Sequence, residues 1–136
     1  MDENELKART KLFARRVIHL CSKLPNTVVG RVIAGQLLRA GTSVGANYRA
    51  ACRGRSKAEF AAKLGTVEEE ADECAYWMEL IIEEQLMSPA RVLPLHDEAE
   101  ALMKIAASSR LTTMRRLRTE CRPDPIANRK SQIANP

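Results

Sequence analysis

The stretch LLRAGTSVGANYRAACRGRS, residues 37–56, decides how the chain folds. Between residues 41 and 47 it contains two glycines, a threonine, a serine and an asparagine, which are residue types that usually mark a turn. Its larger apolar residues, Leu37, Val44 and Tyr48, nevertheless recur at the spacing of one helix face. We therefore expect a helix here, with small residues that allow close approach by another helix backbone.

The same apolar spacing runs through most of the chain and alternates nowhere convincingly enough for a strand. It predicts an all-α fold with helices at about residues 5–24, 28–53, 56–87 and 95–121. Ser56 and Glu59 form a capping box at the start of the third helix, and Gly54 suits a left-handed residue before it. Residues 1–121 are thus expected to form one four-helix domain, and residues 122–136, with three prolines and no apolar period, a disordered tail.

One buried face is expected on each helix. The predicted core positions are Leu6, Phe13, Val17, Leu20, Leu24, Val29, Ile33, Leu37, Ala40, Val44, Tyr48, Ala51, Phe60, Leu64, Val67, Ala71, Cys74, Met78, Ile81, Leu95, Ala99, Leu102, Ala106, Ser109, Thr113 and Leu117. In the third helix these positions step alternately by four and three residues, which is a regular heptad seam.

The second helix is small or apolar around most of its circumference, so a second buried side is expected. Because a bundle buries one side of each helix, this second side indicates a contact between subunits. Two aromatic residues of the third helix also lie off its seam, although a tyrosine on a monomer surface is the alternative. The residues expected at the contact are Gly35, Leu38, Gly41, Thr42, Gly45, Tyr76 and Trp77.

Composition excludes several functional classes for this chain of 136 residues. No apolar run is long enough to span a bilayer, and the polar N-terminus is unlike a signal peptide, so we expect a cytoplasmic protein. Its four cysteines and two histidines are widely separated, without the spacing of a zinc site or a disulfide framework. We expect buried, reduced thiols and no metal, cofactor or small-molecule substrate.

Charge is segregated along the sequence. Residues 1–55 carry a net charge of +8, residues 56–100 carry −9, and residues 101–136 carry +6. These blocks could neutralise one another inside a bundle, or the basic blocks could face a polyanion. The sequence leaves both open.

Four segments together resemble a known family. They are Gln-Leu-Leu-Arg-Ala at 36–40, Ser-Val-Gly-Ala-Asn at 43–47, Ser-Lys-Ala-Glu-Phe at 56–60 and Tyr-Trp-Met-Glu-Leu at 76–80. The pattern, which extends over residues 12 to about 117, is similar to that of bacterial four-helix bundle proteins first noticed in intervening sequences of 23S ribosomal RNA genes. That family often has Asn-x-x-Glu-Gly at this point, whereas this chain continues from Asn47 with Tyr48, Arg49 and Ala50. The end of its second helix is therefore more basic than the common pattern of the family.

The resemblance implies an antiparallel up-down-up-down four-helix bundle that assembles as a homopentamer and has no catalytic activity. The biochemical function of the family is largely unsettled. Accessory proteins of diversity-generating retroelements form similar pentamers that bind nucleic acid and a reverse transcriptase, which is an analogy at the level of fold.

Two functions remain open from the sequence. The first is non-specific binding of RNA or DNA through basic helix faces, because phosphate neutralisation needs only clustered cations. The residues expected to do this are Lys7, Lys11, Arg15, Arg49, Arg53, Arg55, Arg115, Arg116 and Arg118. The second is a protein–protein adaptor or scaffold that uses the acidic face of the third helix. An enzyme is disfavoured, since the Glu-x-x-His motif of di-iron bundles and the glycine-rich phosphate loops are absent.

Overall fold

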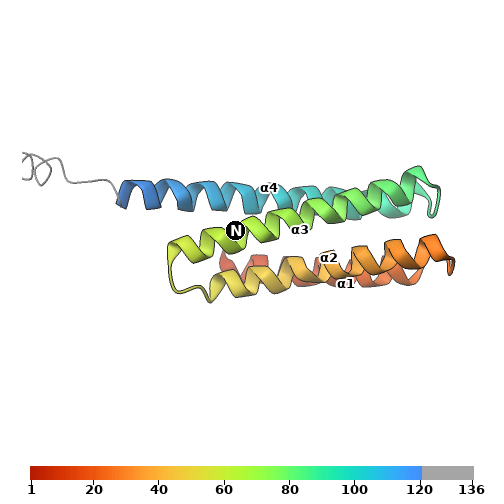
Figure 1. Ribbon diagram of the computed structural model, residues 1–136, viewed down its shortest axis with the longest axis horizontal. Coiled ribbons are helices and arrows are strands. Elements are labelled where there is room, and N and C mark those ends of the chain that lie inside the picture. Colours follow the sequence, from red (N-terminus) through yellow and green to blue (C-terminus); the bar gives the residue numbers. More distant parts are fainter. Residues whose placement is uncertain (121–136) are drawn as a thin grey trace, which may run out of the picture.

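A computed structural model describes residues 1–120, which form four helices joined by short connections. The helices are α1 (Glu3–Ser22), α2 (Val28–Cys52), α3 (Lys57–Glu83) and α4 (Pro89–Glu120). They run antiparallel, with α1 and α2 in one layer and α3 and α4 in the other (Figure 1). Each helix packs on the next in sequence, and α1 and α4 have the smallest contact. The predicted all-α four-helix fold is confirmed, while the predicted tail at 122–136 lies outside the described residues.

Short polar side chains begin three of the helices. Asp2 accepts a hydrogen bond from the backbone N–H of Glu5, Thr27 from that of Gly30, and Ser56 from that of Glu59. The predicted capping box at α3 is present in a shifted form, because the Glu59 carboxylate accepts from the backbone N–H of Arg55 at 2.8 Å. These caps fix where α1, α2 and α3 start.

The ends of α3 and α2 differ from their predicted form. We expected the third helix to reach residue 87, but it ends at Glu83. Gln85 has a φ of 56°, and the N–H of Leu86 reaches back to the carbonyl of Ile81 at 2.9 Å. This is a Schellman turn, which ends a helix with one left-handed residue. Gly54 was expected to be left-handed but is not, since none of the described glycines has a positive φ.

The fourth helix begins at Pro89, six residues before the predicted start at residue 95. Proline is favoured at the first helical position because its missing N–H has no partner there. Pro94 lies inside the helix with its ring exposed. The prediction stopped at Pro94 because an interior proline normally breaks a helix. Tertiary packing overrides that preference here, since Val92 is fully buried against the other helices.

The core follows the predicted stripes closely. Phe13, Val17, Leu37, Val44 and Leu64 are fully inaccessible. Val29 was wrongly predicted to be a core residue, since 53% of its surface is exposed and the inward face of α2 begins at Gly30 instead. Four other predicted core residues, Leu24, Phe60, Ser109 and Leu117, are only half-buried.

The small residues of α2 serve contacts inside the protomer. Gly41 and Gly45 are buried against α1, and a Cβ atom at Gly41 would lie 2.7 Å from Cγ1 of Val17. At Gly45 it would lie 3.2 Å from Oγ1 of Thr10. The prediction that these two glycines meet another subunit is therefore wrong, because the backbone that they allow to approach is that of α1.

A matched pair of alanine substitutions tests this packing. Gly35→Ala should raise the free energy of unfolding by up to about 1 kcal/mol, because Gly35 has open space around it and alanine favours helix. Gly41→Ala should instead lower that free energy by about 1–3 kcal/mol through overpacking against Val17. Urea denaturation of both variants provides the measurement. Equal stabilisation by both substitutions would contradict the close approach of α1 and α2.

Candidate nucleic-acid interface

A groove between α1 and α2 brings together three of the predicted nucleic-acid-binding residues. Lys7 and Lys11 of α1 and Arg49 of α2 line a cavity of about 200 Å³. Its other lining residues are small and are Thr10, Ala14, Thr42, Gly45 and Ala46. The antiparallel pairing of α1 and α2 places residues that are far apart in sequence at the same level of the bundle. The result is a narrow basic groove with a short-side-chain floor.

The cations of this groove are available to an anion. Lys7 contacts Glu3 one turn earlier at 2.9 Å, and this contact lowers the pKa of Glu3. Lys11 and Arg49 are exposed, and neither forms a salt bridge with any residue of the described range 1–120. Lys11 and Arg49, which have no acidic partner within residues 1–120, and Lys7, which pairs with Glu3, therefore line the same groove.

Five other predicted basic residues lie at the same end of the bundle. Arg53 and Arg55 lie in the connection between α2 and α3, and three arginines lie in the last turns of α4. An ion pair between Lys57 and Glu120 joins the start of α3 to the end of α4. The set at this end is called the basic end below and consists of Lys7, Lys11, Arg49, Arg53, Arg55, Arg115, Arg116 and Arg118. Arg15 is exposed on α1 but does not line the groove.

The ion pairs between helices use other basic residues. Arg9 makes a bidentate contact with Glu98, with nitrogen–oxygen distances of 2.8 and 2.7 Å. The other two pairs that involve arginine are Arg39 with Glu73 at 2.8 Å and Arg110 with Glu68 at 2.9 Å. Within residues 1–120, none of the nine predicted nucleic-acid-binding residues pairs with an acid of another helix. Neutralisation between the charge blocks therefore uses Arg9, Arg39 and Arg110, and it leaves the nine predicted residues to other roles.

The remaining residues of the predicted subunit contact lie on the outer face of α2 and α3. Gly35, Leu38 and Thr42 are exposed on α2, and 55% of the Tyr76 surface is exposed on α3. Trp77 is half-buried and stands edge-on to Tyr76, with ring centroids 5.2 Å apart.

A shared carboxylate links these two helices. Glu73 accepts one hydrogen bond from Trp77 Nε1 at 3.2 Å and another from Arg39 at 2.8 Å. Since Arg39 lies on α2 and Trp77 on α3, the outer face is one continuous surface. Apolar side chains extend it toward the start of α2, where Val28 and Val32 are more than half exposed.

One group of potential metal ligands was not predicted. His96 Nε2 lies 2.9 Å from Glu79 Oε2 and 3.7 Å from Glu100 Oε1. The sequence showed His96 only beside Asp97 and Glu98, whereas the turn between α3 and α4 brings Glu79 opposite it. These donors could hold a divalent cation, but both carboxylates are about half exposed and a His–Glu hydrogen bond alone accounts for the arrangement.

The cysteines within the described range are free thiols. Cys74 is fully buried, and burial raises its pKa to about 12. Burial likewise raises the pKa of Cys21 to about 11, and its thiol lies 3.5 Å from the carbonyl of Ala34. Cys52 is less buried than Cys74. The prediction of a buried thiol holds for Cys74, whereas Cys21 and Cys52 are only half-buried against the core.

Thiol labelling tests these environments. In a Cys121→Ser background at pH 8, a disulfide reagent should modify Cys52 first and Cys74 last, because the thiolate is the reactive form. Mass spectrometry of samples taken over time gives the order in which the thiols are modified, with guanidinium-unfolded protein as control. Rapid labelling of Cys74 in the native protein would contradict its burial.

The same burial makes stability depend on pH. Above about pH 9, the free energy of unfolding should fall, because the thiols of the unfolded chain ionise while Cys21 and Cys74 in the folded protein stay protonated until about pH 11 and 12.

Comparison with known proteins identifies the family and the fold of this chain. The family model of 23S rRNA-intervening sequence proteins matches residues 2–108. A solved structure from Bacteroides thetaiotaomicron, described as a protein with unknown function from the S23 ribosomal protein family, is 33% identical, with a TM-score of 0.75. The match covers 81% of this chain and 98% of that one. The search of curated proteins finds no match. With most of its helical region matched, the chain belongs to the 23S rRNA-intervening sequence protein family.

Proposed function

We propose that this protein is a cytoplasmic, non-enzymatic homo-oligomer that binds RNA or DNA through its basic end without reading sequence. The observation that carries the proposal is the groove between α1 and α2, where Lys7, Lys11 and Arg49 converge. Cations held in one register neutralise successive phosphates and release counterions, which is sufficient for non-specific affinity. Neither tyrosine, nor Trp77, lines the groove, so base stacking contributes little.

The outer face of α2 and α3 supports self-association. Its exposed apolar and small residues, including Leu38, Thr42 and Tyr76, form the type of surface that a soluble protein usually covers. The family resemblance implies five subunits. A ring of five copies would repeat the basic end five times, so each bound strand could contact several subunits and gain avidity.

Self-association has a specific test in Gly35→Leu. A Cβ atom at Gly35 has nothing within 4 Å in the protomer, so leucine should leave the bundle folded. On a subunit contact, however, leucine would block close approach by the neighbour. Sedimentation velocity should show the wild type as an oligomer and Gly35→Leu as a smaller species of equal helicity. A wild type that sediments as a monomer at micromolar concentration would contradict self-association.

Nucleic-acid binding is tested directly by fluorescence anisotropy. Labelled single-stranded RNA and duplex DNA of unrelated sequences are titrated with the wild type at low salt. We expect saturable binding of both, with affinities that differ little between sequences. Failure to bind either polymer at low salt would exclude the proposal and favour the adaptor alternative, in which the acidic face of α3 meets a protein partner.

A further inference from the structure

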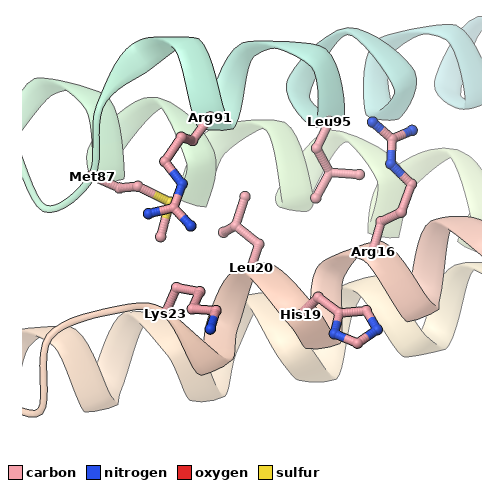
Figure 2. Close-up of a pocket in the computed structure, with 7 residues that line it drawn as sticks. All are labelled: Arg16, His19, Leu20, Lys23, Met87, Arg91 and Leu95. Carbon is pink, nitrogen blue, oxygen red and sulfur yellow. The ribbon is translucent and has the colours of Figure 1, made fainter.

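A second cationic site lies at the opposite end of the bundle. A pocket of about 280 Å³ forms where the end of α1 meets the connection between α3 and α4. Arg16 borders it from α1, Lys23 from the position directly after α1, and Arg91 from the first turn of α4 (Figure 2). None of these residues was among the predicted nucleic-acid-binding set. The pocket is separate from the basic end, which lies at the other connection.

The cations of this pocket have no carboxylate among them, and Arg91 and Lys23 lie on one side of Leu95 while Arg16 lies on the other (Figure 2). No acidic residue lines the pocket, and none of its arginines or lysines forms a salt bridge with residues 1–120. Arg91 also occupies the first turn of a helix, where the helix dipole disfavours a positive charge. His19 adds a ring nitrogen that can donate a hydrogen bond. An anion bound between Arg91 and Lys23 would neutralise both charges.

The base of the pocket is apolar. Leu20 and Leu95 are 8% and 3% exposed, and their side chains point toward each other across the gap (Figure 2). Met87 lies beside the Arg91 guanidinium and supplies an adaptable thioether surface. A bare inorganic anion would leave this surface uncovered. The pocket therefore matches a ligand with one strongly anionic group and one small apolar body.

We infer that this pocket binds a phosphate monoester carried on a small apolar or aromatic group. A monoester bears a charge of about −1.5 to −2 at neutral pH, whereas a phosphate inside a nucleic-acid strand bears one. The planar fork of Arg91 suits two phosphate oxygens, and Lys23 on the same side of the pocket adds a point charge, while Arg16 lies beyond Leu95 (Figure 2). The ligand could be a free small molecule or the 5′-terminal phosphate of a strand.

The probe for this site is phenyl phosphate, titrated calorimetrically into the full chain. We expect saturable binding with one site per subunit, and weaker binding of inorganic phosphate, which cannot cover Leu20 and Leu95. Arg91→Gln and Lys23→Gln should each weaken phenyl phosphate binding about tenfold or more, the loss typical of one charged hydrogen-bonding partner. Lys104→Gln is the matched control, since Lys104 is exposed on α4 and does not line the pocket.

A second arm identifies the source of the phosphate. Tighter binding of a 5′-phosphorylated RNA than of the same strand with a 5′-hydroxyl, lost in Arg91→Gln, would assign the site to strand ends. Equal binding of the two strands alongside bound phenyl phosphate would assign it to a free ligand. No saturable phenyl phosphate binding, or equal weakening by Lys104→Gln, would overturn the inference. Neither result depends on whether the basic end binds RNA.

Discussion

Replacing Phe13 with alanine should lower the free energy of unfolding by about 3–5 kcal/mol, as for a fully enclosed aromatic side chain. Phe13 is completely inaccessible and lies in the main core cluster with residues of every helix. Its removal would leave a void that the long, close-packed helices could only partly fill. Urea denaturation monitored by circular dichroism, at a fixed protein concentration, measures the loss.

Phe60→Ala is the matched control within the same protein. Phe60 was expected to open the heptad seam of α3, but it is half-buried in the first turn, and the inward face begins at Ala61. Its truncation should cost less than that of Phe13, because Phe60 is only partly buried. A loss for Phe60→Ala equal to that for Phe13→Ala would contradict the burial pattern.

Reversing two charges of the groove should produce the largest functional effect. In Lys11→Glu/Arg49→Glu, the affinity for single-stranded RNA at low salt should fall roughly a hundredfold or more, because two phosphate contacts become two repulsions. Both side chains are exposed, so the bundle should remain folded. Anisotropy titration of the labelled RNA measures the change.

The control variant for this experiment is Arg31→Glu/Lys104→Glu. It changes the net charge by the same amount, but both residues are exposed and lie away from the groove. It should lose much less affinity than the groove variant. An equal loss in both variants would mean that overall charge, and not the groove, governs binding.

The sequence predicted elements whose signals are local. The cap at Ser56 and the heptad seam of α3 depend on neighbours within one or two turns, and the structure shows the cap, and the seam from Leu64 onward, where expected. The predicted start of α4 was wrong because a proline such as Pro94 is locally unfavourable inside a helix. Only the packing of Val92 against distant residues explains the longer helix. The role of Gly41 was misassigned for a related reason. A small residue indicates close approach but does not identify the approaching backbone, which here is α1.

The candidate sites depend still more on contacts between helices. Charge segregation identified Lys11 and Arg49, but only the antiparallel pairing of α1 and α2 places them in one groove. The hydrogen bond between His96 and Glu79 and the pocket of Arg16 and Arg91 join residues 17 and 75 positions apart. No periodicity or motif connects such pairs, so they could not be predicted from a single sequence.

The salt dependence of RNA binding tests the proposed function most directly. For the wild type, the logarithm of the association constant should fall linearly with the logarithm of salt concentration. In Lys11→Gln/Arg49→Gln, the magnitude of that slope should decrease by about 1.4, or about 0.7 for each phosphate of a single strand that the variant no longer neutralises. A slope unchanged by the double substitution, or a wild type without measurable affinity at low salt, would contradict the account.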